Sequence, residues 1–228
     1  MVTKRNGGAH PLIVELVGPA GAGKSAVAER LIARPDVVRA SLWNLPWALL
    51  LESVLRSVPS LVRFCVATRS VPREELKQIF RLNALRLFVR RRVADASIVV
   101  LDEGPVFALS WLEVFGHPRL QDGSAEPWWR HTYAVWAGVL DRVVLLDAPL
   151  PVLTSRIRQR YKPADVFRHM TDGDIRDFTG RYRTAFARVL SGLAQAGGPV
   201  PVTLTTPETT PDRLGEAVLA LLVESRGG

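Results

Sequence analysis

A glycine-rich octapeptide constrains this chain more than any other feature of its sequence. Residues 18–25 read GPAGAGKS and lie between an apolar run at 12–17 and a helix expected from about Lys24 to Ala33. The glycines let the backbone curl so that its N–H groups converge, and the helix N-terminus adds a positive dipole at the same point. The spacing is that of a P-loop, and its position between strand and helix predicts a phosphate-binding loop.

The P-loop pattern predicts a role for each of its residues. We expect Lys24 to neutralise charge between the β- and γ-phosphates of a nucleoside triphosphate, and the Ser25 hydroxyl to be a ligand of Mg²⁺. ATP is the expected nucleotide. The residues expected to bind it are Gly18, Pro19, Ala20, Gly21, Ala22, Gly23, Lys24, Ser25 and Ala26.

The order of apolar runs predicts an α/β fold with a parallel sheet. Runs rich in branched residues occur at 12–17, 97–101, 142–146 and 200–204, with a shorter candidate at 37–40. Near-continuous apolarity is typical of strands covered on both faces, and the intervening segments are long enough for crossover helices. One break, Glu15, falls inside the first run.

Three helices can be located from periodicity and caps. A broad apolar stripe predicts a helix over 74–93, and Thr171 with Asp174 three residues later predicts the start of a long amphipathic helix ending near 197. A final helix is expected from Pro211. Without a linker, a repeat or a shift in composition, residues 1–228 are expected to form a single domain.

Two acids follow the predicted strand at 97–101. Residues 98–101 are apolar and are followed directly by Asp102 and Glu103. A carboxylate at this edge of the sheet would lie beside the P-loop magnesium, so Asp102 is the expected metal ligand, directly or through water, with Asp147 a weaker rival. Glu103 is left open between a general base, a residue that orients water, and a favourable start to the following helix.

Arginines gather after the fourth predicted strand. Arg156 and Arg160 share a face of a predicted helix, whereas Arg158 points elsewhere. Arginines on a segment that closes over the phosphates would stabilise the charge that develops during phosphoryl transfer. We therefore expect Arg156 and Arg160 to be catalytic, together with Lys24, Asp102 and Glu103, on a lid-like segment over about 154–172.

With these motifs in this order, the chain resembles the thymidylate-kinase-like branch of the P-loop nucleoside and nucleotide kinases from about Leu12 to Leu222. The resemblance implies a three-layer P-loop NTPase fold, with a five-stranded parallel sheet flanked by helices. It also implies that the loop 205–209 faces the adenine. The sequence departs from the thymidylate kinase pattern at Ala20, where an acid is usual, and at Glu103, where arginine is usual.

Composition narrows the partners and the location. A net charge of +8 predicts anionic partners, which nucleotides satisfy. One cysteine, Cys65, and a short polar start predict a cytoplasmic protein, and charges and prolines interrupt the apolar stretch 42–67, so no integral membrane association is expected. Nucleic acid is not an expected partner despite the arginines at 90–92, and a homodimer is left open.

The acceptor of the phosphate is not decided by the sequence. A phosphorylated acceptor would need cations near the middle helix, and an alcohol would need a base such as Glu103. The candidate cations are Arg69, Arg73, Arg81 and Arg86. Tryptophans could stack on an acceptor ring, although core packing is preferred for them and for the segment 42–67. The tryptophans considered are Trp43, Trp47, Trp111, Trp128 and Trp129.

These features favour an ATP- and Mg²⁺-dependent kinase acting on a small-molecule acceptor, including a nucleoside or nucleotide. An ATP-hydrolysing regulatory or switch protein is the alternative, because the Asp102–Glu103 pair could equally orient a water molecule.

Overall fold

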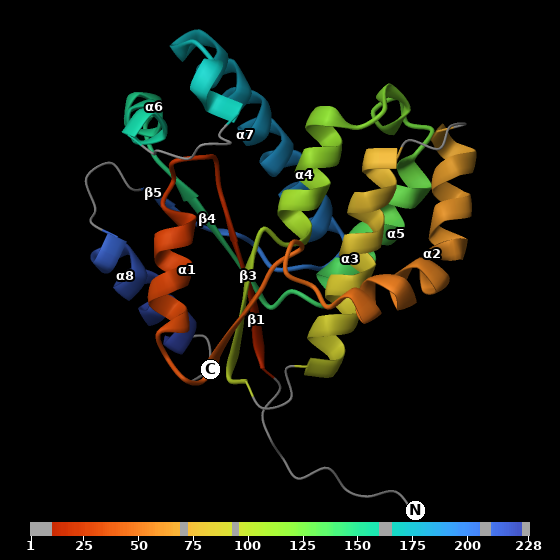
Figure 1. Ribbon diagram of the computed structural model, residues 1–228, viewed down its shortest axis with the longest axis horizontal. Coiled ribbons are helices and arrows are strands. Elements are labelled where there is room, and N and C mark those ends of the chain that lie inside the picture. The colour runs from red at the N-terminus through yellow and green to blue at the C-terminus, as the bar shows by residue number, and fades with distance from the viewer. Residues whose placement is uncertain (1–10, 69–72, 93–95, 160–165, 206–210, 225–228) are drawn as a thin grey trace, which may run out of the picture.

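The strands form the predicted parallel sheet. The computed structural model describes residues 11–68, 73–92, 96–159, 166–205 and 211–224. Within them, five parallel strands pair in the order β2-β3-β1-β4-β5 (Figure 1). The strands are β1 (Leu12–Val17), β2 (Val37–Ala40), β3 (Ile98–Asp102), β4 (Arg142–Asp147) and β5 (Val202–Thr205). The α/β class and all five strands, including the short one at 37–40, are therefore confirmed.

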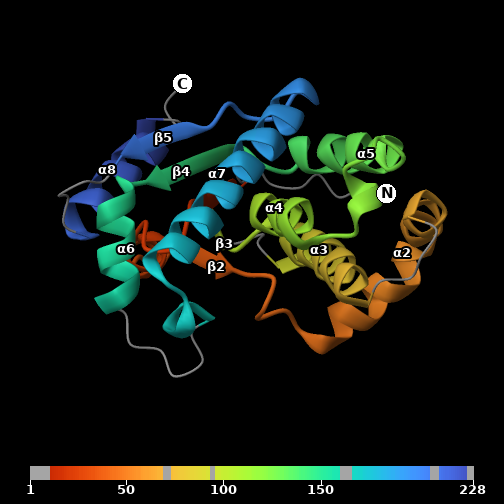
Figure 2. The ribbon, with the colours of Figure 1, turned by 90° about the horizontal axis from the view of Figure 1, so that it is seen from above.

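Helices cover both faces of this sheet. They are α1 (Lys24–Ile32), α2 (Trp47–Thr68), α3 (Arg73–Arg92), α4 (Pro105–Phe115), α5 (Glu126–Ala137), α6 (Leu150–Gln159), α7 (Asp172–Gln195) and α8 (Pro211–Glu224), with 3₁₀ turns η1 (Pro118–Leu120) and η2 (Val166–His169). Helices α1 and α8 lie on one face, and α3, α4, α5 and α7 lie on the other (Figures 1 and 2). This is the expected three-layer arrangement.

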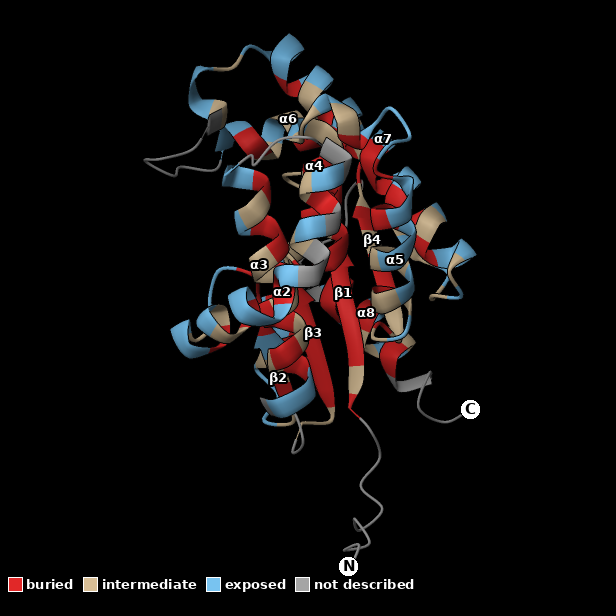
Figure 3. Cartoon of the chain, turned by 90° about the vertical axis from the view of Figure 1, so that its right-hand side faces the viewer, coloured by how far each residue is buried: buried red, intermediate tan, exposed pale blue. Residues whose placement is uncertain are grey.

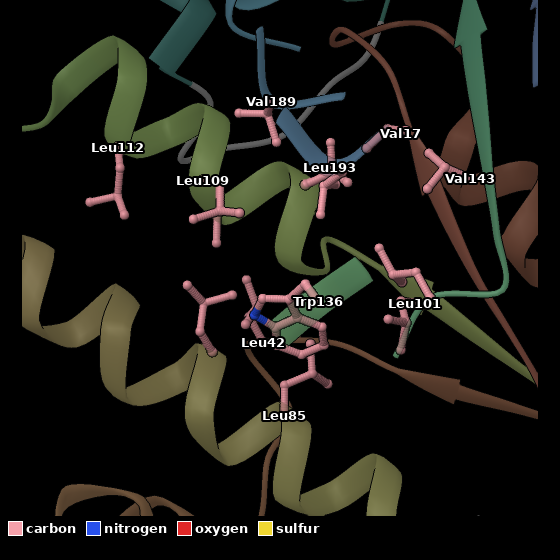
Figure 4. Packing of buried hydrophobic residues seen from close by; sticks show 14 of the residues in the cluster. Val17, Leu42, Leu85, Leu101, Leu109, Leu112, Trp136, Val143, Val189 and Leu193 are labelled. Atoms are coloured by element: carbon pink, nitrogen blue, oxygen red, sulfur yellow. The ribbon is translucent and has the colours of Figure 1, made fainter. Parts of the chain in front are cut away.

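Alternation along the strands divides the core in two. Ile13 and Val17 of β1 face α3–α5 and α7, whereas Val14 and Leu16 face α1 and α8. The strands are buried on both sides, as the red ribbon in Figure 3 shows. In the larger half, Leu85, Leu109, Trp136 and Leu193 come from four different helices and meet over the sheet (Figure 4). Burial of apolar surface on two faces fixes the sheet as the central layer.

Helix α7 begins with the capping box predicted from Thr171 and Asp174. The Thr171 hydroxyl accepts a hydrogen bond from the Asp174 N–H at 3.1 Å, and the Asp174 carboxylate accepts one from the Thr171 N–H at 2.7 Å. Such caps contribute about 1 kcal/mol each. The cap fixes where α7 starts, and the first half of α7 forms one wall of the site described below.

Helix α2 packs on the protein with only part of its surface. Leu49 and Phe64 are buried, but an apolar stripe on the helix is exposed to solvent. The exposed stripe consists of Trp47, Leu51, Val54, Leu55, Val58, Val62 and Val66. The interpretation of 42–67 as core is therefore right for one face and wrong for the other. Over the described residues, no helix combines the length and apolarity needed to cross a bilayer.

Candidate active site

The glycine-rich loop joins β1 to α1 and is held against the end of β4. Gly18, Gly21 and Gly23 all have positive φ angles, of 147°, 82° and 94°. At Gly18, an added Cβ would lie 2.0 Å from the Leu146 carbonyl oxygen, so a side chain cannot fit without moving the loop. Glycine is therefore required at this position both by the backbone conformation and by the close approach of β4.

Lys24 and Ser25 occupy the first turn of α1, where the loop ends. The Lys24 ammonium donates hydrogen bonds to the carbonyl oxygens of Gly18 at 2.6 Å and Pro19 at 2.9 Å, so it lies over the loop. Ser25 is exposed at the same point. No acidic residue lies in the first turn of α1, which leaves the positive end of the helix dipole uncompensated and favourable to an anion.

A cavity of about 600 Å³ opens over the loop and runs to helix α7. That volume is within the range of small-molecule sites. Its lining consists of Gly18, Pro19, Ala20, Gly21, Gly23, Lys24, Ser25, Ala26, Glu29, Asp102, Glu103, Phe107, Phe167, Phe178, Tyr182 and Phe186. All the predicted loop residues except the buried Ala22 therefore face the same space as the two strand-end acids.

Asp102 lies at the carboxyl end of β3, paired in register with Leu16 of β1. Strand alternation puts it on the same face as Ile98 and Val100, which is the face covered by α1. Its buried carboxylate accepts a hydrogen bond from the guanidinium of Arg39 in β2. Arg39 was not among the residues predicted for the site. Its signal in the sequence is a charge within the short apolar run 37–40.

Ser25 and Asp102 both line the cavity and offer a hydroxyl oxygen and a carboxylate oxygen. Hard oxygen donors, used one or two at a time beside nucleotide phosphates, are what Mg²⁺ takes in nucleotide sites. The chemistry of this donor pair therefore fits the ion that the P-loop implies.

Glu103 follows directly in an unusual backbone conformation. Its φ angle of 58° makes it the single non-glycine residue with positive φ in the described part of the chain. For a residue of this type the conformation costs on the order of 1 kcal/mol, and such residues cluster at functional sites. The N-cap of α4 is Gly104, not Glu103, so the idea that Glu103 starts the helix receives no support.

The N-terminus of α4 is satisfied by Glu15, which the sequence showed only as a break in β1. The two Glu15 carboxylate oxygens accept hydrogen bonds from the N–H groups of Val106 at 2.9 Å and Phe107 at 3.1 Å. Burial raises the pKa of Glu15 to about 8, and the nearby charge of Asp102 adds to the rise. Glu15 thus joins the central strand to the segment that carries Asp102 and Glu103.

One of the predicted arginines, Arg156, contacts the loop. Its guanidinium donates to the Gly21 carbonyl at 3.3 Å, whereas Arg158 points away, as predicted, and pairs with Asp172 at 2.8 Å. Arg160 falls outside the described residues, as do residues 160–165 of the lid-like segment and 206–209 of the loop expected near adenine. Asp147 does not line the cavity and pairs with Arg183 at 2.8 Å.

Five aromatic side chains form a wall of the cavity. Phe107 comes from α4, Phe167 from η2, and the other three, Phe178, Tyr182 and Phe186, from α7. Neighbouring rings are in contact, with centroids 5.1 Å apart for Phe167 and Phe178 and 4.9 Å apart for Phe178 and Tyr182. Burial raises the pKa of Tyr182, and the charge of Glu103 raises it further.

The tryptophans considered for stacking do not line this cavity. Trp128 and Trp129 are buried in the core, Trp47 is exposed, and Trp43 lies under the guanidinium of Arg81 at 4.1 Å. Trp111 packs against Phe115. The α7 aromatics were recognised as the stripe of a helix but not as a pocket wall, because periodicity shows which residues share a face and not what that face encloses.

Comparison with known proteins agrees with this geometry. The sequence pattern of the AAA domain family matches residues 13–185. The chain belongs to the AAA domain family. No curated protein matches the sequence. The sheet order and the helices on both of its faces give this AAA domain protein a P-loop kinase-like α/β fold.

Solved structures are similar to this AAA domain protein at low identity. Deoxyadenosine kinase from M. mycoides with bound dCTP is 12% identical, with 93% of this chain and 100% of that chain covered and a TM-score of 0.50. Shikimate kinase from Bacteroides thetaiotaomicron is 14% identical, with 92% and 98% covered and a TM-score of 0.49. A Thermus thermophilus protein is 20% identical, with 94% and 98% covered and a TM-score of 0.47.

Proposed function

We propose that this protein is an ATP- and Mg²⁺-dependent kinase that transfers the γ-phosphate to a small-molecule acceptor. The observation that carries the proposal is the single cavity of about 600 Å³, in which the P-loop, two strand-end carboxylates and an aromatic wall face one another. A P-loop by itself supports nucleotide binding. A further compartment beside the phosphates supports a second substrate.

The proposed roles follow from position. The backbone N–H groups of residues 18–26, except the proline at 19, and the ammonium of Lys24 hold the phosphates, at the end of α1 that lacks an acidic residue. Ser25 and Asp102 hold Mg²⁺, which would neutralise phosphate charge when bound. Arg156, which contacts Gly21, and Arg160 stabilise charge on the transferred group.

We also propose a domain organisation, a location and a family branch for the whole chain. Residues 1–228 act as one domain, with a lid over about 154–172, in the cytoplasm. Among the P-loop nucleoside and nucleotide kinases, the thymidylate-kinase-like branch is the proposed branch. A nucleoside or nucleotide is one proposed acceptor. Nucleic acid is not a proposed partner.

Hydrolysis of ATP in a regulatory or switch protein is the competing function. The observation that favours it is the position of Glu103 directly after Asp102, facing the cavity. A carboxylate there could orient a water molecule in place of an acceptor.

ATP turnover separates these two functions. The purified protein would be assayed with Mg²⁺ and ATP, with and without a pool of nucleosides, nucleotides, sugars and alcohols. Lys24→Ala is the test variant and Lys77→Ala the matched control, because Lys77 pairs with Glu74 on the surface of α3. Acceptor-dependent ADP formation that is lost only in Lys24→Ala supports a kinase. If ATP turnover is equally fast without any acceptor, the kinase proposal is wrong and ATP hydrolysis replaces it.

A further inference from the structure

Outside the P-loop, the described lining of the cavity consists of aromatic and acidic side chains. Its wall is five aromatic side chains, and among the described lining residues Lys24 is the sole cation. Lys24 already lies against the carbonyl oxygens of Gly18 and Pro19, at the phosphate end. The space left for a second substrate is therefore apolar and aromatic rather than basic.

The charged groups that do face this space are acidic. Glu29, Asp102 and Glu103 line the cavity, and of these Asp102 is already paired with Arg39 and is the proposed ligand of Mg²⁺. A phosphate monoester carries a charge of about −1.5 to −2 at neutral pH and is normally recognised by arginine or lysine. An acceptor that already carries phosphate would therefore meet carboxylates where it needs cations.

The arginines expected to bind a phosphorylated acceptor lie elsewhere. Arg81 covers the ring of Trp43, and Arg86 lines a separate cavity of about 140 Å³ beside Trp128 and His131. Arg73 is exposed at the start of α3, and Arg69 lies outside the described residues. None of the described members of this set contributes to the main cavity.

Glu103 is in place to activate a hydroxyl group. It lines the same cavity as the P-loop and the five aromatic side chains. Its backbone is held in the left-handed region by neighbours on both sides, with the Glu103 carbonyl accepting from the Leu42 N–H and α4 anchored on Glu15. A costly conformation that its surroundings enforce is typical of a residue whose position matters for function.

We infer that the acceptor is a non-phosphorylated hydroxyl compound with an apolar or aromatic body, and that Glu103 is its general base. This inference rests on the kinase function proposed above. The Glu103 carboxylate takes the proton of the acceptor hydroxyl, and the acceptor oxygen forms a bond to the γ-phosphorus. The bond from the γ-phosphorus to the β–γ bridging oxygen breaks, its electron pair leaves with ADP, and the proton later passes to water.

Matched pairs of probes test the acceptor class. Each pair shares a body and differs in its end group: 2-phenylethanol and its phosphate, pyridoxine and its 5′-phosphate, thymidine and its monophosphate. Phosphorylated product is measured by mass spectrometry, and binding is measured separately by calorimetry on protein loaded with Mg²⁺ and a non-hydrolysable ATP analogue. We expect the hydroxyl member of at least one pair to bind and react at least tenfold better than its phosphate.

Two aromatic variants test the wall. Phe167→Ala removes a lining ring, and Phe115→Ala removes a ring of the same size that also packs on Phe178 but does not line the cavity. We expect the dissociation constant of the hydroxyl probe to rise at least fivefold in Phe167→Ala and to stay within twofold in Phe115→Ala. Both sites are partly exposed, so neither substitution should prevent folding.

Glu103→Gln tests the base. It should lower the rate of transfer about 10²- to 10⁴-fold while leaving the binding of the hydroxyl probe unchanged. The acceptor inference would be overturned, with the kinase function still standing, by either of two results. One is that the protein phosphorylates the phosphate member of the pairs better than the hydroxyl member, and the other is that wild type and Phe167→Ala bind the hydroxyl probe equally well. Acceptor-independent ADP formation with no phosphorylated probe would overturn the kinase itself, and failure of every hydroxyl probe to bind would overturn the inference directly.

Discussion

The carboxylate of Glu15 accepts a hydrogen bond from the backbone N–H of Val106 at 2.9 Å, which ties the middle strand of the sheet to the first turn of α4. Asp102 and Glu103, the acids of the candidate site, come just before α4 in the chain. A buried acid at a helix N-terminus is stabilised by the dipole and the free N–H groups, but it must also bear desolvation. In Glu15 desolvation is the larger effect on the pKa.

Glu15 should make folding stability fall as the pH rises. Its pKa is about 8 in the folded protein against an ordinary value of 4.5, so the folded state binds the proton more tightly than the unfolded state. The stability contributed by this group is fully present below pH 4.5 and is lost as the pH rises through about 8. Urea unfolding measures the free energy of unfolding of wild type and of Glu15→Gln between these pH limits. The difference between the two proteins should fall by a few kcal/mol as the pH rises. A constant difference would contradict it, and Glu74→Gln on the surface of α3 serves as the control.

Arg39 should stabilise Asp102 most strongly when no metal is bound. Arg39→Ala leaves a buried carboxylate without its partner, at a cost of about 1–3 kcal/mol. Because Mg²⁺ with ATP would supply another cation at Asp102, the loss should shrink when both are added. Thermal unfolding with and without Mg²⁺ and ATP measures this, against Arg34→Ala, which breaks an exposed pair with Asp36. A loss that is the same in both conditions would argue against metal at Asp102.

Gly18→Ala should destroy the loop geometry. The new Cβ would lie 2.0 Å from the Leu146 carbonyl oxygen, at a φ of 147°. We expect at least tenfold weaker ATP binding and a loss of stability of about 1–3 kcal/mol from strain and overpacking. Gly180→Ala is the matched control, since its added Cβ meets nothing within 4 Å and helix propensity should stabilise it by about 0.5–1 kcal/mol. Calorimetric titration with ATP and urea unfolding report the two effects, and wild-type ATP affinity in Gly18→Ala would contradict the prediction.

The strain at Glu103 should be measurable. Asparagine tolerates positive φ better than other residues with a Cβ, so Glu103→Asn should raise the free energy of unfolding by up to about 1 kcal/mol. Glu103→Gln keeps the unfavourable conformation and should remain within about 0.5 kcal/mol of wild type. Both variants should lose phosphoryl transfer. Equal stability of the two would show that the backbone there is not strained.

The exposed stripe of α2 should contribute little to folding. Leu55 is 71% exposed, whereas Phe64 on the same helix is fully buried. Leu55→Gln should change the free energy of unfolding by less than about 0.5 kcal/mol, and Phe64→Ala should lower it by about 3–5 kcal/mol. A large loss in Leu55→Gln would mean that the stripe is covered in solution.

The residues of the candidate site could be predicted where their pattern is local in sequence. Residues 18–25 and the acids at 102 and 103 were found because a phosphate loop and an acid-ended strand are short patterns with a fixed physical purpose. Arg39 and Glu15 were not found, since each acts on a partner 63 or 91 residues away. Pairing of β2 with β3 brings Arg39 near Asp102, and Glu15 meets the start of α4, the helix that follows β3.

The sequence by itself determined the α/β class, the five strands, the P-loop and the start of α7. The reason is that local propensity, caps and hydrophobic periodicity depend on residues close together in the chain. Tertiary structure alone decided that Phe178 and Tyr182 line a cavity, that Arg86 lies away from it, and that one side of α2 is exposed. The physical reason is that periodicity fixes which side chains share a face, whereas the packing of distant elements fixes what that face meets.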